Sequence, residues 1–76
     1  MAKFVGKVTK KLFGKGTKSE YEALYLGTAK EQYVLRRQGG NPFFDPELQE
    51  LVGKKVCCKG FVEDYILMIS EWTVIE

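Results

Sequence analysis

The chain has 76 residues and a formal net charge of +2, a length that allows one domain. Hydrophobic residues make up 45% of it, which is typical of a globular protein and too high for a disordered one. Histidine, the commonest general base and the commonest metal ligand, is missing, and we expect no cofactor. No apolar run approaches the roughly 18 residues that span a bilayer. The first residues lack the apolar stretch of a signal peptide, so we expect a cytoplasmic protein without a membrane role.

The charge is distributed unevenly along the chain. Residues 1–18 hold six lysines and no acidic residue, whereas residues 19–76 hold six basic and ten acidic residues. The first segment is therefore strongly basic, which indicates where on the chain a partner should be sought.

The first expected element is a strand over residues 3–13. Apolar residues and glycine alternate there with lysines, which is the period of a half-buried strand. Gly6 inside this run predicts a bulge or a sharp bend, at which one strand serves two sheets. Residues 14–18 contain two glycines and two lysines and predict a flexible basic loop.

Residues 19–37 fit two interpretations. Ser19 and Glu22 are spaced like a capping box, which would begin a helix. Alternatively, residues 21–26 and 33–37 form two strands joined by a turn around residues 27–31. The tyrosines, Val34 and the interruption at Gly27 favour the strands.

The clearest helix signal follows a turn at residues 39–42. Asp45 suits the N-cap and Pro46 the first helical position. Apolar residues at 48, 51 and 52 form one face, and Gly53 ends the helix. The predicted helix is about two turns long.

Two further strands are expected after this helix. Residues 54–63 alternate, with Val56 and Cys58 on one side. The adjacent Cys57 points to the opposite side, so a disulfide between the two cysteines would distort the backbone, and Cys57 is expected to be an exposed or half-exposed thiol. A tight turn at residues 63–64 leads to the last strand, which begins at residue 65, is apolar on both faces and has a bulge near Ser70.

The order of three strands, a short helix and two strands resembles the OB-fold, a small five-stranded Greek-key barrel. Residues 51–62 (LVGKKVCCKGFV) resemble the helix exit and fourth strand of many OB domains. Residues 18–23, 33–43 and 45–46 also look like a family of short uncharacterised bacterial proteins, a likeness that supports the fold only. We therefore predict one all-β, OB-fold-like domain over residues 1–76, with a short helix between its third and fourth strands. An SH3-like barrel is the main alternative.

Catalytic patterns are missing from the sequence. A serine or cysteine nucleophile would have no histidine to activate it. Carboxylate pairs at residues 20 and 22 and at residues 63 and 64 are typical of solvated surface. The glycines at residues 14 and 16 lack the spacing of a phosphate-binding loop. We expect a protein that is not an enzyme.

Resemblance to OB domains implies a ligand face on the second and third strands, flanked by loops. Aromatic rings there would stack on bases and cations would hold phosphates, as in single-stranded nucleic-acid binding. Arg36 and Arg37 point to opposite faces, so at most one of them belongs to this face. The short acidic turn at residues 63–64 counts against a tight site, and two of the three tyrosines could instead pack into the barrel. The candidate binding residues are Lys15, Lys18, Tyr21, Tyr25, Tyr33 and Arg37.

A second basic surface follows from the strand alternation. In an OB barrel the first and fourth strands are neighbours, so their outward lysines would form one patch. Its predicted members are Lys3, Lys7, Lys11, Lys55 and Lys59. Such lysines are either a solvated stripe that discourages aggregation or a site for phosphates or an acidic protein.

Two functions stay open at this point. One is weak binding of single-stranded nucleic acid or a phosphate backbone. The other is an accessory subunit that binds proteins, and a homodimer is possible in this case. The excess of apolar residues near the C-terminal end of the sequence favours this second function.

Overall fold

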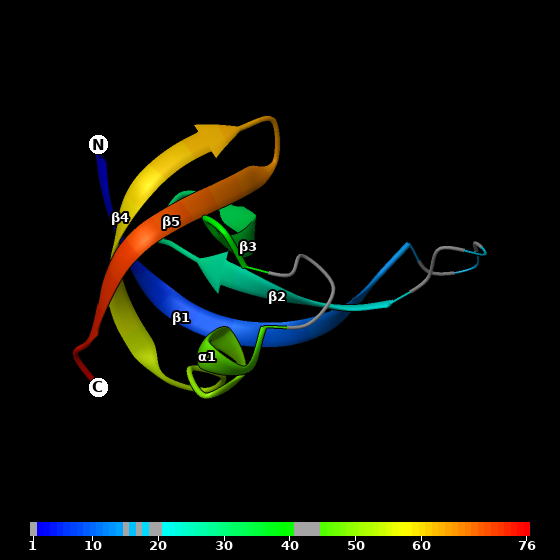
Figure 1. Cartoon of the computed structure of the whole chain (residues 1–76), viewed down its shortest axis with the longest axis horizontal. Helices are drawn as coiled ribbons and strands as arrows, with labels where there is room; N and C mark the ends of the chain where they lie inside the picture. Colours follow the sequence, from blue (N-terminus) through cyan, green and yellow to red (C-terminus); the bar gives the residue numbers. More distant parts are fainter. Residues whose placement is uncertain (1, 15, 17, 19–20, 41–44) are drawn as a thin grey trace.

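Five strands and one short helix make up the fold (Figure 1). The computed structural model describes residues 2–14, 16, 18, 21–40 and 45–76. The elements are β1 (Ala2–Phe13), β2 (Tyr21–Gly27), β3 (Gln32–Arg37), α1 (Pro46–Gln49), β4 (Lys55–Glu63) and β5 (Ile66–Val74). The strands close into a barrel in the order β1-β2-β3-β5-β4, and β3 and β5 are the parallel pair. The predicted all-β class, five strands closed into a small barrel with one short helix between β3 and β4, is confirmed.

Strand β1 serves two neighbours, as its glycine predicts. Residues 2–7 pair with β4 and residues 7–13 pair with β2. A Cβ atom at Gly6 would overlap the backbone carbonyl of Gly27, so only glycine allows this close approach. Beyond the bend, the β1–β2 hairpin extends away from the rest of the barrel (Figure 1).

The segment with two interpretations forms two strands. β2 and β3 are joined by a turn in which the amide of Thr28 donates to the carbonyl of Glu31 at 2.8 Å. Glu22, which a helix would place in a capping box, lies inside β2, and Ser19 lies outside the described residues. The strand interpretation is confirmed.

Helix α1 begins where predicted but is shorter. The Asp45 side chain accepts a hydrogen bond from the Glu47 amide at 3.1 Å, and Pro46 is the first helical residue. The helix has four residues, so the predicted length of about two turns is wrong. The reason lies in β1, where the backbone of Val8 bonds with the chain that follows the helix. The Gly53 amide donates to the Val8 carbonyl at 2.8 Å, and the Val8 amide donates to the Lys54 carbonyl. Gly53, with φ of 86°, turns the chain toward these bonds.

The core lies inside the barrel and is closed at one end by α1. Val8, Leu26, Leu67 and Ile69 are fully buried, and Leu48 from α1 joins them. Strand β4 contributes Val56 and Cys58, as its alternation predicts. The β4–β5 register shifts between Lys59 and Gly60, leaving Ser70 as the extra residue of the predicted bulge.

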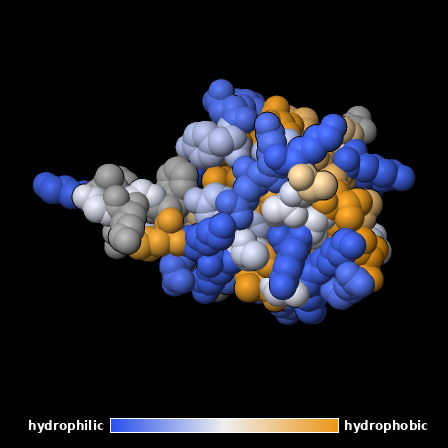
Figure 2. Space-filling model, turned by 180° about the vertical axis from the view of Figure 1, so that it is seen from behind, coloured by the Kyte–Doolittle hydropathy of each residue, from blue (hydrophilic) through white to orange (hydrophobic). Residues whose placement is uncertain are grey.

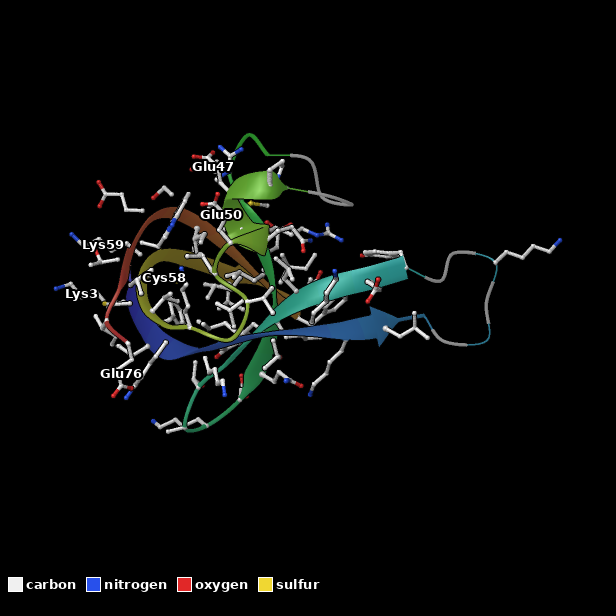
Figure 3. The ribbon with its side chains drawn as sticks, turned by 90° about the horizontal axis from the view of Figure 1, so that it is seen from below. Lys3, Glu47, Glu50, Cys58, Lys59 and Glu76 are labelled. Carbon is white, nitrogen blue, oxygen red and sulfur yellow. The ribbon has the colours of Figure 1, made fainter. Side chains whose placement is uncertain are left out.

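The two cysteines differ in their surroundings. Cys58 points into the barrel (Figure 3), and Cys57 is half-exposed. Burial, and secondarily the neighbouring Cys57, raises the pKa of the Cys58 thiol to about 11. A buried thiol held in its neutral form is chemically inert.

Candidate nucleic-acid interface

The outer surface of β2, β3 and β5, with the adjoining part of β4, carries most of the polar and aromatic groups that suit a ligand. Strand alternation places Leu26, Leu35 and Leu67 in the core, so the residues next to them point outward. The registers align Tyr25 with Val34, Arg36 with Met68, and Met68 with Phe61. We call this surface the tyrosine face and define it by Tyr21, Tyr25, Arg36, Phe61, Ile66 and Met68; Val34 lies on the same side of β3 but is buried.

Tyrosine side chains gather at the β2 side of this face. Burial raises the pKa of Tyr25, and electrostatic interactions with Tyr21 and with Tyr65 raise it further. Lys11 from β1 stands over the Tyr25 ring, with its Nζ 5.8 Å from the ring centroid. The same ammonium donates a hydrogen bond to Gln32 Oε1 at 3.2 Å. Rings and a cation therefore occur side by side, as stacking on a base and holding a phosphate require.

Arg36 is the unusual member of the tyrosine face. Its NH2 group donates to the Tyr21 hydroxyl at 3.2 Å. Its Nε atom is buried and has no hydrogen-bond partner among the described residues. No carboxylate of the described residues forms an ion pair with it. A half-buried guanidinium without a counter-ion is costly, and a phosphate of a ligand would supply the missing negative charge.

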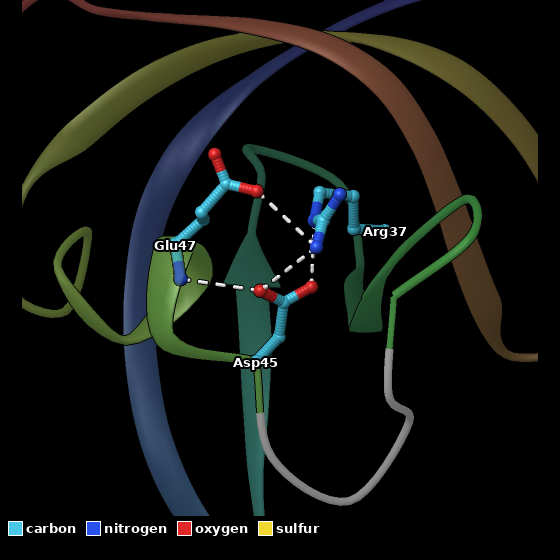
Figure 4. Close-up of polar contacts among 3 residues, drawn as sticks. All are labelled: Arg37, Asp45 and Glu47. Carbon is cyan, nitrogen blue, oxygen red and sulfur yellow. Dashed lines mark hydrogen bonds and ion pairs between the residues drawn. The ribbon is translucent and has the colours of Figure 1, made fainter.

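Arg37 faces the other way and is engaged within the fold (Figure 4). Its Nε lies 2.7 Å from Asp45 Oδ2, and its NH2 group lies 3.2 Å from Glu47 Oε2. The hydrogen bond to Asp45 raises the pKa of Arg37. Arg37 therefore fixes α1 against the end of β3, and the structure does not bring it together with the tyrosines.

The other predicted binding residues are spread over the molecule. Tyr33 aligns with the buried Leu26 and packs edge-on against Phe4, with ring centroids 5.7 Å apart. A hydrogen bond with Glu31 raises the pKa of Tyr33. Lys18 is exposed in the β1–β2 connection, and Lys15 lies outside the described residues. Of the six predicted residues, the structure brings Tyr21 and Tyr25 together.

The predicted lysine patch is largely assembled on the outside of β1 and β4. Lys3 aligns with Lys59 and Lys7 with Lys55. Figure 3 shows Lys3 and Lys59 pointing away from the same side of the barrel. We call these four residues the lysine face. Lys11 is not part of it, because β1 beyond its bend pairs with β2 and carries Lys11 to Tyr25.

Acidic residues reduce the positive charge of the lysine face. Lys59 Nζ lies 3.7 Å from Glu71 and Lys55 Nζ lies 3.8 Å from Glu76. All four side chains of these pairs are about half-exposed or more, so each pair contributes little to stability. Each pair does lower the net positive charge of this surface, in contrast to Arg36.

Two shallow hollows border the tyrosine face. One, of about 330 Å³, lies between Arg36, Phe61, Met68 and the turn after β3. The other, of about 200 Å³, adds Glu63, Asp64 and Ile66 to Arg36, Phe61 and Met68. Figure 2 shows that hydrophilic residues cover most of the surface seen from behind, with hydrophobic residues only in patches.

From the sequence we weighed Arg36 against Arg37 and selected Arg37, and we did not select Phe61, Met68 or Tyr65 for this site. Alternation separates Arg36 from Arg37, and the buried Leu35 next to Arg36 is the signal that directs Arg36 outward. Phe61 and Met68 join the site only because β5 lies between β3 and β4, which is a property of the barrel and not of any one segment.

A scan against family models, a search of curated proteins and a search of solved structures found no match to this chain. Within the described part of the chain, no group of three or more cysteine, aspartate and glutamate side chains is placed to hold a metal ion. The one helix there, α1, is too short to cross a membrane.

Proposed function

We propose that this chain is an OB-fold module, without enzymatic activity, that binds single-stranded nucleic acid through the tyrosine face. The strand order, the parallel pairing of β3 with β5 and the position of α1 support the OB-fold assignment. In OB-folds the face of the second and third strands is the usual ligand surface, and the tyrosine face covers those strands here.

Arg36 is the observation that carries the proposal. Its guanidinium is half-buried, lacks an ion-pair partner among the described residues and leaves Nε unsatisfied beside aromatic rings. Folding places this charge there at a cost, which a phosphate of the ligand offsets. Tyr25, with Lys11 above its ring, supplies the neighbouring surface for a base.

Fluorescence anisotropy with a labelled oligothymidylate of about ten nucleotides tests this function at low and moderate salt. We expect micromolar affinity that falls as salt rises, because phosphate contacts release counterions. Arg36→Gln should weaken binding at least about fivefold, since it removes a charge-assisted contact. Lys59→Gln is the matched control, because it removes one positive charge from the lysine face. Equal losses in the two variants would show that only net charge matters and would refute the site.

The lysine face supports a second candidate function, which is binding an acidic protein. Lys3 and Lys59 stand directly opposite each other, as do Lys7 and Lys55. Glu71 and Glu76 offset part of this like-charge repulsion, and an anionic partner would offset more of it. Half-exposed Cys57 and exposed Val5 lie between the two lysine pairs. Loss of binding to an acidic peptide in a Lys3→Glu, Lys59→Glu double variant, with oligothymidylate binding retained, would separate this function from the first.

A further inference from the structure

We propose that the tyrosine face reads one base of its ligand and prefers guanine, through the juxtaposition of Arg36, Phe61 and Glu63 across β3, β5 and β4. This inference rests on the proposed binding of single-stranded nucleic acid and adds a specificity to it. Arg36 would hold a phosphate, Phe61 would stack on the base, and Glu63 would accept hydrogen bonds from the edge of that base.

The registers fix the spacing of these three residues. Arg36 aligns with Met68, and Met68 aligns with Phe61, so the three lie in one row across the strands. Adjacent strands are about 4.8 Å apart, which separates Arg36 from Phe61 by about 10 Å. Glu63 follows Phe61 by two positions on the same outer side of β4, roughly 7 Å further along. The side chains of all three border one hollow of about 200 Å³.

Phe61 and Met68 make the apolar part of this hollow. Phe61 is 43% exposed, although it is a large apolar residue in a strand, so much of its ring is accessible to a ligand. Met68 is half-buried between it and Arg36, and thioethers adapt well to flat rings. A base stacked on Phe61 would cover apolar surface that is exposed without a ligand.

Glu63 determines which base fits. Its side chain is exposed and forms none of the ion pairs found among the described residues, and Asp64 borders the same hollow. An ionised carboxylate only accepts hydrogen bonds. The Watson–Crick edge of guanine offers two adjacent donors, N1–H and the 2-amino group, which match the two carboxylate oxygens. Adenine and cytosine offer an amino donor beside an acceptor, and thymine offers one donor between two carbonyls, which a carboxylate repels.

The acidic turn also orients the ligand. Carboxylates at residues 63 and 64 repel phosphate, whereas Arg36 at the other side of the hollow attracts it. The backbone of the ligand should therefore pass over Arg36, and the base should point toward Glu63. The residues that count against a general phosphate-binding groove thus become the selective part of a base-reading one.

Competition anisotropy with oligothymidylates that differ only in one central base tests this inference. The central base is guanine, hypoxanthine, adenine, cytosine or thymine, within about ten nucleotides, a length that fits one OB domain. We expect the oligonucleotide with central guanine to bind at least about fivefold tighter than the one with central thymine. This ratio is at the low end of the discrimination that a bidentate hydrogen-bonded pair provides, because the site is exposed. Hypoxanthine, which lacks the 2-amino group, should be intermediate.

Two variants assign the preference to Glu63. Glu63→Gln should remove the guanine preference and leave binding of plain oligothymidylate within about twofold of wild type. Glu71→Gln, an exposed carboxylate on the lysine face, should keep the preference. Salt-dependent binding that is equal for all five central bases would overturn this inference and leave the proposed function standing. Failure of every oligonucleotide to bind would overturn the proposed function itself.

Discussion

Asp45→Ala should destabilise the fold strongly, because the Asp45 carboxylate performs two tasks. It caps α1 through the Glu47 amide at 3.1 Å and pairs with Arg37 at 2.7 Å. The Asp45 side chain is 4% exposed and that of Arg37 is 29% exposed. Removal of the Asp45 carboxylate would therefore leave the Arg37 charge without this partner where water reaches it only in part. Loss of an N-cap costs about 1 kcal/mol. Loss of the ion pair costs about 1–2 kcal/mol, below the usual range for a fully buried pair because Arg37 keeps access to water and to Glu47.

The expected total is about 2–3 kcal/mol, which lowers Tm by about 10–20 °C in a domain of this size. Urea unfolding followed by circular dichroism measures the free energy of unfolding directly. Glu47→Gln is the control, because its carboxylate is 62% exposed and its pair with Arg37 should contribute about 0.5 kcal/mol or less. Asp45→Asn keeps a capping oxygen and should fall between the two. An Asp45→Ala variant within about 0.5 kcal/mol of wild type would refute the assigned role.

Three further outcomes follow from the barrel interior. Gly6→Ala should lower the free energy of unfolding by at least about 3 kcal/mol or prevent folding, since its Cβ would strike the Gly27 backbone. The control is Gly27→Ala, whose Cβ would meet nothing nearer than 3.9 Å. Its free energy of unfolding, measured in urea, should stay within about 1 kcal/mol of wild type. Half-exposed Cys57 should react with an aromatic disulfide reagent at pH 8 in the native protein, and buried Cys58 only after unfolding; reaction of two thiols at the native rate would contradict this. Because the pKa of Cys58 is raised from 9.0 to about 11, its contribution to stability is complete below pH 9 and is lost as pH rises toward 11. Urea unfolding measured at several pH values should show the free energy of unfolding fall by about 2–3 kcal/mol over this range. The Cys58→Ala variant should not show this fall.

Local signals were sufficient for most of the fold. Alternation identified the inner residues of the barrel part of β1 and β4, such as Val8, Val56 and Cys58. It failed at the far end of each strand, where Leu12 and Val62 are exposed. Gly6 marked the bend, since the chain there passes too close to Gly27 for any side chain. Asp45 marked the start of α1 through its capping oxygen.

The length of α1 was beyond such signals. The apolar residues at 48 and 51 continue a helical spacing, and both are buried. The chain nevertheless leaves the helix after Gln49, because Val8 takes hydrogen bonds with Gly53 and Lys54. A tertiary bond to a residue about 45 positions earlier therefore overrides the local preference.

The candidate site depends even more on long-range pairing. Alternation shows that Arg36 and Arg37 point apart, but only the position of Asp45 shows which of them is engaged within the fold. Tyr33 lies inward because β3 aligns it with Leu26, a register that neither strand reveals alone. The residues in one row with Arg36 are Met68 of β5 and Phe61 of β4. They follow Arg36 by 32 and 25 positions in the sequence.

The central claim is that ligand binds on the tyrosine face. Titration of isotope-labelled protein with oligothymidylate, followed by backbone amide NMR, tests it most directly. We expect saturable shifts for Tyr25, Arg36 and Met68, and unchanged signals for Lys3 and Lys59 on the lysine face. Shifts confined to the lysine face, or no shifts at millimolar oligonucleotide and low salt, would contradict it.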